Sequence, residues 1–210
     1  MKALLLIDIQ NDFIPGGSLA VTSADEIIPL VNQLQSFFDL VVATQDWHPS
    51  NHTSFASNHP GKEPFDQIVL NGLNQVLWPD HCVQGSHGAA FSSKLNMNRV
   101  ETIFRKGTDR GIDSYSGFYD NGRRKSTALA EYLRAKQVAE VYIVGLAADY
   151  CVYYTAKDAI AEGFTTYIVE DAVRAISIEG FKLAEEDFIA RGGRIIESDA
   201  LKNEPDGTKF

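Results

Sequence analysis

The sequence predicts an α/β protein built on a doubly wound, six-stranded, mainly parallel sheet with helices on both faces. Short β-rich apolar runs recur along the chain and are separated by helical patterns. The runs are continuous and not alternating, which is typical of strands buried on both faces, and the intervening helices supply the crossovers of a parallel sheet. The expected strands are residues 3–9, 40–44, 102–104, 141–144, 166–169 and 194–196.

The expected helices carry recognisable start and stop signals. Ser23 and Glu26 form a capping-box pattern ahead of the first helix. Pro29 is awkward inside that helix, so it is an alternative marker of the true first turn. Two later helices end before glycines that suit a left-handed stop: residues 151–162 before Gly163, and residues 178–191 before Gly192.

The chain of 210 residues is expected to form a single domain, 1–210, because α/β folds of this length are commonly one unit. Residues 49–100 lack clear strand or long-helix periodicity. A long irregular segment inside a compact domain is usually functional, so this region is expected to build the site. Residues 201–210, polar from Asn203 onward, are expected to form a loose tail.

Charge and cysteine content narrow the class of protein. A formal net charge of -9 argues against nucleic-acid and anionic-membrane partners, which demand clustered basic residues, and residues 123–125 are most simply a solvated loop or helix entry. The first apolar run stops at Asp8, too early for a signal peptide or a membrane span. Cys82 and Cys151 are too few for a disulfide framework and fit a reducing compartment. A cytoplasmic location is therefore expected.

Chemically active residues follow the expected strands. Ligands of open α/β sheets bind beyond the carboxyl ends of the strands. The first strand runs into Asp8, the second into residues 46–48, the third into Lys106, and the fourth into the turn that precedes Cys151. A carboxylate, a pair of potential metal ligands, a lysine and a thiol are therefore expected to share one rim of the sheet.

Cys151 is the candidate nucleophile. A thiol at a strand–helix turn lies near the positive end of a helix, and a nearby ammonium group such as that of Lys106 also favours the thiolate, so an acidic thiol is expected. Asp8 is a candidate proton shuttle. Each residue has a plainer alternative: a buried small hydrophobe for Cys151, a turn cap for Asp8 and a surface lysine for Lys106. Their common position after strands favours the catalytic interpretation.

Asp46 and His48 are candidate metal ligands, because alternate residues of an extended chain face the same side. All five histidines lie between residues 48 and 87. His81 is favoured as a third ligand, since Trp78 and Pro79 precede it and fix its direction. The alternatives are His52, His59 and His87, with Ser54 as a weak oxygen contact or water holder; Cys82 is expected to be structural packing.

A flat aromatic substrate pocket is expected from Phe13, Leu19, Trp78 and Tyr115, although aromatic residues more often serve the core. The sequence contains no Walker loop, no G-x-G-x-x-G after a strand and no G-x-S-x-G elbow. Nucleotide binding and serine hydrolysis are therefore disfavoured.

Five motifs, in family order and spread over nearly the whole chain, carry a family resemblance. They are LIDIQNDF at residues 6–13, TQDWHP at 44–49, WPDHCV at 78–83, FRKG at 104–107 and GLAADYCV at 145–152. With these motifs the chain resembles the bacterial nicotinamidases of the isochorismatase-like cysteine hydrolase superfamily. The resemblance implies a six-stranded parallel sheet, an Asp/Lys/Cys triad and one divalent metal ion.

The resemblance assigns roles by position. Asp8 resembles the general acid/base, Lys106 the thiolate-stabilising cation and Cys151 the nucleophile. The bond before Ala147 is expected to be cis, with the N–H groups of Ala147 and Cys151 holding the oxyanion. Asp46, His48 and His81 look like the metal ligands, while Ser54 is similar to a metal-approaching position of one branch, and His52 matches a ligand of another branch less well.

The activity implied is hydrolysis of nicotinamide to nicotinate and ammonia through a cysteine thioester, with the metal positioning the pyridine ring. Such an enzyme feeds NAD salvage and also deamidates pyrazinamide. Zinc is the favoured ion, with iron and manganese as alternatives, and a homodimer is expected because relatives often form one. The rival hypotheses are an amidase for another small amide, an isochorismatase, and a non-catalytic flavodoxin-like module, which leaves Cys151, Lys106 and the histidines unexplained.

Overall fold

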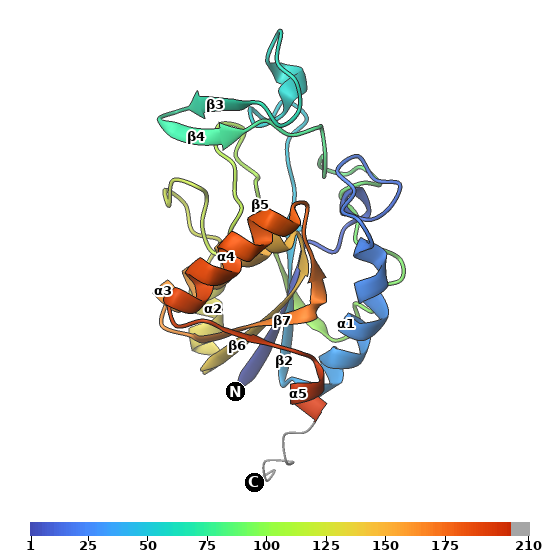
Figure 1. The fold of residues 1–210 in the computed structure, drawn as a ribbon, viewed down its shortest axis with the longest axis vertical. Coiled ribbons are helices and arrows are strands. Elements are labelled where there is room, and N and C mark those ends of the chain that lie inside the picture. The colour runs from blue at the N-terminus through green and yellow to red at the C-terminus, as the bar shows by residue number, and fades with distance from the viewer. Residues whose placement is uncertain (203–210) are drawn as a thin grey trace.

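A computed structural model describes residues 1–202 of the chain. Six strands form one sheet in the order β5-β2-β1-β6-β7-β8, and all neighbouring strands are parallel (Figure 1). The predicted six-stranded parallel sheet is therefore confirmed. Its strands are β1 (Lys2–Ile7), β2 (Leu40–Asp46), β5 (Val100–Lys106), β6 (Glu140–Leu146), β7 (Thr165–Arg174) and β8 (Arg194–Ile196).

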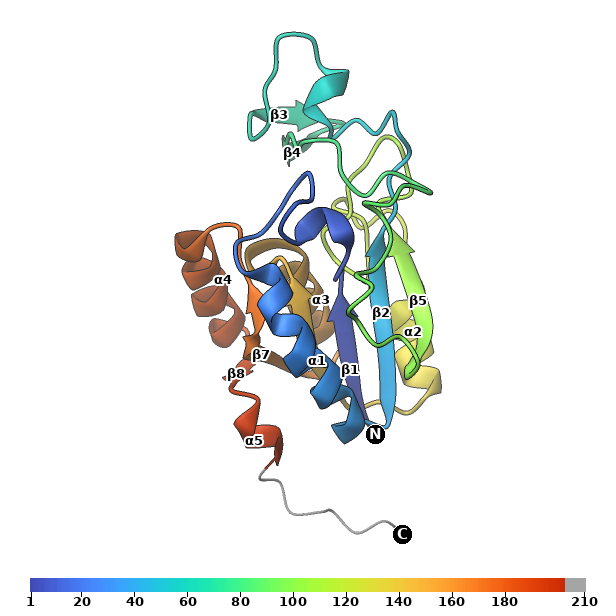
Figure 2. The ribbon, with the colours of Figure 1, turned by 90° about the vertical axis from the view of Figure 1, so that its right-hand side faces the viewer.

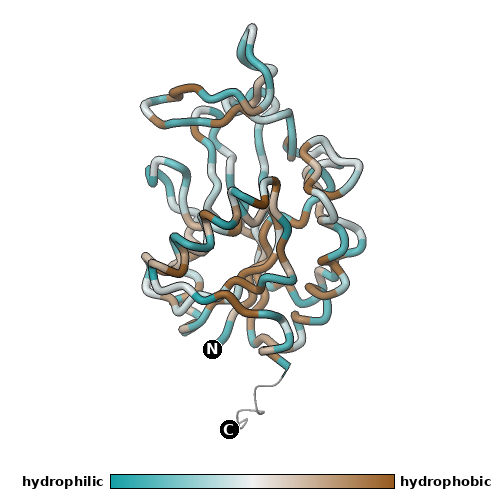
Figure 3. Tube along the Cα trace, viewed as in Figure 1, coloured by the Kyte–Doolittle hydropathy of each residue, from teal (hydrophilic) through white to brown (hydrophobic). Residues whose placement is uncertain are grey.

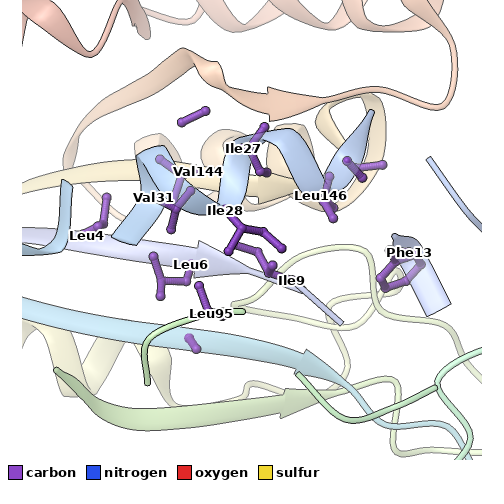
Figure 4. Close-up of a cluster of buried hydrophobic side chains, with 14 of the residues drawn as sticks. Leu4, Leu6, Ile9, Phe13, Ile27, Ile28, Val31, Leu95, Val144 and Leu146 are labelled. Carbon is purple, nitrogen blue, oxygen red and sulfur yellow. The ribbon is translucent and has the colours of Figure 1, made fainter. Parts of the chain in front are cut away.

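Helices cover both faces of the sheet and enclose two apolar clusters. Leu4 and Leu6 of β1 point into one cluster with α1, as Figure 4 shows, whereas Ala3 and Leu5 point into the other. The hydropathy trace places the brown, apolar segments along the strands between the helices (Figure 3). The helices are α1 (Ile28–Leu34), α2 (Leu129–Ala135), α3 (Tyr153–Ala161), α4 (Ile178–Ala190) and α5 (Asp199–Lys202).

The first helix begins later than its sequence pattern indicates. Ser23 adopts a left-handed conformation with φ 55°, and its hydroxyl donates to the Glu26 carboxylate at 2.9 Å without capping a backbone N–H group. The capping-box prediction is therefore wrong. Residues 24–27 form a 3-10 turn, and α1 starts at Ile28 with Pro29 in its first turn, which confirms the alternative start.

The glycine stops are confirmed. Gly163 follows α3 with φ 89° and Gly192 follows α4 with φ 93°. The helical turn that contains Cys151 begins earlier than predicted, as a π-helical segment over Ala148–Val152 that leads directly into α3. Wide turns of this kind are frequent at functional sites.

A two-stranded hairpin interrupts the segment that the sequence leaves irregular. Strands β3 (Gln67–Leu70) and β4 (Leu73–Val76) pair antiparallel around Asn71 and Gly72, whose φ angles are 50° and 84°. Asn-Gly is a strong signal for a two-residue hairpin turn, so this hairpin was predictable. It lies beyond the carboxyl ends of the sheet strands, at the end of the molecule opposite the N-terminus (Figure 2).

Two short helices have no counterpart in the prediction. Helix α2 follows Ala128, which has a φ of 68° and supplies no capping side chain. Helix α5 contains residues 201 and 202, and Leu201 is buried in the cluster beside α1, so the loose-tail prediction is wrong there. The rest of the predicted tail, residues 203–210, lies outside the described residues. Within residues 1–202 no helix is long and apolar enough to cross a bilayer.

Candidate active site

Four neighbouring strands deliver the predicted residues to one rim. Strand β1 ends before Asp8, whose φ of 46° turns the chain away from the sheet. Strands β2 and β5 end with Asp46 and Lys106, which are paired in register. Strand β6 ends at Leu146, and the following bond to Ala147 is cis, as the resemblance implied.

Lys106 contacts the other three side chains at this rim: those of Asp8, Asp46 and Cys151. Its side chain is fully buried, and Nζ lies 2.6 Å from Asp46 Oδ1, 2.9 Å from Asp8 Oδ2 and 3.3 Å from Cys151 Sγ. It also donates to the Ser114 carbonyl at 2.9 Å. Burial alone would lower the pKa of Lys106, but the carboxylates of Asp46 and Asp8 raise that pKa well above its ordinary value. The lysine is therefore a fixed positive charge.

Asp8 is also completely buried. Burial raises the pKa of the Asp8 carboxyl, and the nearby Lys106 ammonium opposes that rise. The Thr44 hydroxyl donates to Asp8 Oδ1 at 2.7 Å, whereas Oδ2 accepts no hydrogen bond and faces Lys106 as an ion pair. A carboxyl whose pKa burial raises is a stronger base than an exposed one and is suited to take up and return a proton.

The Cys151 thiol differs from the acidic thiol expected from the sequence. Burial raises the pKa of Cys151 well above its ordinary value; Lys106 lowers it, but the carboxylates of Asp8 and Asp46 raise it further. The expectation of an acidic thiol is therefore wrong, because it counted the lysine and the helix end but neither the burial of the sulfur nor the two anions. A resting thiol next to the Asp8 carboxylate needs that carboxylate as its proton acceptor.

Asp46, His48 and His81 bring potential ligand atoms within 4.8 Å of one another, and all three residues are buried. His48 Nε2 lies 3.4 Å from Asp46 Oδ2, and His81 Nε2 lies 3.8 Å from the same oxygen. In each ring Nδ1 faces a backbone carbonyl, that of Gly107 at 2.9 Å and that of Pro79 at 2.8 Å. A ring that donates from Nδ1 presents a bare Nε2 to the cluster.

The donor set fits a divalent cation. His48 Nε2 is buried and neither accepts nor donates a hydrogen bond, which is costly for a polar atom unless it binds something else. One carboxylate and two imidazole nitrogens form an ordinary ligand set for a transition metal. Gly107 makes room for this arrangement, because a Cβ there would lie 2.3 Å from His48 Cε1.

The other predicted oxygen and histidine positions are engaged elsewhere. The Ser54 hydroxyl lies 2.7 Å from His52 Nδ1, and His52 Nε2 lies 3.3 Å from the Ile112 carbonyl. His59 contacts the Thr53 carbonyl at 2.8 Å, and His87 lies at the surface beside Asn11. A contact of Ser54 with a metal stays a prediction. Cys82 packs in the core, as expected.

A pocket that Cys151 lines opens onto the thiol. All four residues predicted for a substrate pocket line it: Phe13, Leu19, Trp78 and Tyr115. Asp113, Tyr150 and Ile176 also line it and were not predicted from the sequence. Tyr150 was findable as the neighbour of Cys151, and its ring lies edge-on to Trp78 with the centroids 4.8 Å apart. Asp113 and Ile176 sit in segments without a motif and carry no comparable signal.

Comparison with known proteins places these features among hydrolases. The model of the isochorismatase domain matches residues 2–200. A nicotinamidase from Acinetobacter baylyi is 50% identical over 197 residues, which cover 93% of this chain and 92% of the relative. A solved nicotinamidase/pyrazinamidase of Acinetobacter baumanii superimposes with a TM-score of 0.93 at 48% identity, covering 95% of this chain and 97% of that one. The pyrazinamidase of Pyrococcus horikoshii in complex with zinc gives a TM-score of 0.77 at 39% identity, with coverages of 93% and 98%.

Proposed function

This chain belongs to the isochorismatase family, and we propose that within it the protein is a nicotinamidase that hydrolyses nicotinamide to nicotinate and ammonia. The observation that carries the proposal is the contact of Lys106 with both Asp8 and Cys151, the last of which lines an aromatic pocket. A buried acid, a cation and a thiol in mutual contact are the parts that covalent amide hydrolysis requires.

The first half-reaction uses Asp8 as base and then as acid. Asp8 takes the thiol proton, and the Cys151 sulfur, beside the Lys106 ammonium, attacks the carboxamide carbon. The N–H groups of Ala147 and Cys151 hold the oxygen as it gains charge. Collapse of the adduct breaks the C–N bond, and Asp8 gives its proton to the leaving nitrogen, so that ammonia departs and a thioester remains.

The second half-reaction restores the enzyme. Asp8 deprotonates a water molecule, which attacks the thioester carbon. The C–S bond breaks, Cys151 regains a proton from Asp8, and the product acid loses its own proton to solvent and leaves as nicotinate. Phe13, Leu19, Trp78 and Tyr115 hold the flat ring during both steps, and their placement around the pocket supports that role.

The proposed cation site comprises Asp46, His48 and His81, with Ser54 as a weaker oxygen contact or a holder of water. When bound, a divalent ion supplies a Lewis-acidic contact for the ring nitrogen of the substrate. Zinc is the first proposal, supported by the zinc complex of the related pyrazinamidase, and iron and manganese suit the same ligands. Pyrazinamide, which carries a ring nitrogen in the same position relative to its carboxamide, is proposed as a second substrate.

The remaining parts of the proposal are a single domain, a role in NAD salvage, a cytoplasmic location and a homodimer. Two free, buried cysteines agree with a reducing compartment. The central claim is tested by incubating the pure protein with nicotinamide, pyrazinamide or isochorismate and measuring the ammonia or pyruvate that is released. We expect ammonia from nicotinamide and pyrazinamide and no pyruvate from isochorismate. Pyruvate without ammonia would refute the proposal.

A further inference from the structure

Gln10 belongs to the first sequence motif but has no part in the chemistry above. It is fully buried, and its carboxamide makes three hydrogen bonds to backbone groups. Nε2 donates to the Asp46 carbonyl at 2.8 Å and to the Ala89 carbonyl at 2.9 Å, while Oε1 accepts from the Asp46 N–H at 2.8 Å. Both backbone groups of Asp46 are therefore bound by one side chain.

The two hydrogen bonds between Gln10 and the Asp46 backbone replace those that a longer β1 would make with the end of β2. The register of β1 with β2 ends at Leu6 and Ala43, because β1 stops before Asp8 turns away. On its other edge Asp46 is still paired with Lys106 of β5. Without Gln10, the end of β2 would be held from one side only, at the residue whose carboxylate faces both Lys106 and the histidines.

We infer that Gln10 is a positioning residue for the cation site, acting through the backbone of Asp46; this inference rests on the proposed function of that site. The Asp46 side chain divides its oxygens: Oδ1 accepts from Lys106 at 2.6 Å, and Oδ2 lies 3.4 Å from His48 Nε2. Rotation or displacement of the Asp46 backbone would misplace both oxygens together. Partners that orient a ligand typically change metal affinity by roughly 10–100-fold when removed.

Gln45 offers a matched control. It is also buried, and its Nε2 donates to the same Ala89 carbonyl at 2.9 Å, but its Oε1 accepts from Arg105 and not from Asp46. Gln10→Met and Gln45→Met each remove a buried carboxamide and one hydrogen bond to the Ala89 carbonyl. Only the first removes the side-chain bonds to the Asp46 backbone.

The experiment measures the affinity of the full chain for Zn²⁺ by competition with a chromophoric chelator, at a temperature where circular dichroism shows each variant folded. We expect Gln10→Met to weaken Zn²⁺ binding at least roughly tenfold, and Gln45→Met to change it less than about threefold. Equal affinities in Gln10→Met and wild type, or equal losses in the two variants, would overturn the inference.

If Gln10→Met does not fold, Gln10→Asn is used in its place, since it keeps the amide but is one methylene too short to span Asp46. The same expected loss and the same overturning results apply. A wild type that binds no Zn²⁺ would instead refute the proposed cation site itself, so the two failures are distinct.

Discussion

Lys106 Nζ lies 3.3 Å from Cys151 Sγ, although 45 residues separate the two in sequence. The contact arises because β5 ends with the lysine and the turn after β6 carries the cysteine. The sulfur therefore meets a positive charge that is itself fixed by two carboxylates.

Replacing the nucleophile gives the most direct prediction. Cys151→Ala should abolish ammonia release from nicotinamide while leaving the far-UV circular dichroism unchanged, because no other described thiol faces the pocket. Cys82→Ala is the matched control and should retain most activity, since Cys82 is packed in the core. Hydrolysis by Cys151→Ala would exclude the thioester route.

The pH dependence of Cys151 alkylation tests the effect of Lys106 on the thiol. Iodoacetamide should modify Cys151 before Cys82 in the native protein, because Cys151 lines the pocket and Cys82 is 0% exposed. In Lys106→Met the pH profile for Cys151 should move to higher pH, since Lys106 lowers the pKa of that thiol. Peptide mass spectrometry across a pH series measures both, and an unmoved profile would show that the ammonium does not act on the sulfur.

The same variant should have a characteristic pH-dependent stability. Removing Lys106 leaves Asp8 as a buried anion without its cation, at a cost of about 3–5 kcal/mol near neutral pH. Burial already raises the Asp8 pKa above its unfolded value, and loss of the lysine raises it further. Between those two pKa values the folded state binds the proton more tightly, so stability falls as pH rises.

Urea unfolding of Lys106→Met and wild type at about pH 5 and about pH 8 checks this sign. The difference in free energy of unfolding between wild type and Lys106→Met should be smaller at the lower pH, where protonation of Asp8 costs less. A deficit that grows on acidification would contradict the proposed charge balance.

Variants of the histidines distinguish the role of the cation site from that of Cys151. Wild type should contain close to one divalent ion per chain, and His48→Ala should lose it, because His48 supplies a buried, unpaired Nε2. His81→Ala should impair nicotinamide turnover yet leave Cys151 alkylation largely intact. Elemental analysis and alkylation rates provide the two readouts.

His87→Ala is the control for His48→Ala and His81→Ala, since His87 lies at the surface beside Asn11. A metal-free wild type with full activity would refute the cation assignment and favour a metal-independent amidase of the same fold.

Gly107 permits a steric test of the same site. Gly107→Ala should displace His48, because the new Cβ would lie 2.3 Å from its Cε1, and Zn²⁺ affinity should fall. Gly61→Ala is the matched control: Gly61 also has a positive φ, 76° against 65°, but a Cβ added there would meet no atom within 4 Å. Both variants carry a backbone penalty of about 1–2 kcal/mol, so only the metal affinity distinguishes them. Equal Zn²⁺ affinities would show that the His48 ring can move without consequence.

Physical reasons explain which parts of the site could be predicted from the sequence. Strand ends were informative because parallel strands gather their carboxyl ends at one rim, which brought Asp8, Lys106 and Cys151 together. The direction of the Cys151 pKa shift was misjudged because it depends first on burial and then on three competing charges, and no local sequence pattern encodes either the burial or the distances. Asp113 and Ile176 reach the pocket through loops, where position follows from tertiary packing and not from periodicity.

The order of the strands also bears on how the chain acquires its fold. Strand β1 is synthesised before the other five strands of the sheet, yet it lies between β2 and β6 and pairs Leu6 with Val144. During synthesis one edge of β1 therefore stays unpaired until β6 has emerged. Such distant pairings slow folding and expose strand edges while they wait. The pairing of β1 is thus completed late, and the rim that gathers Asp8 and Cys151 cannot exist before the segment carrying the thiol has been made.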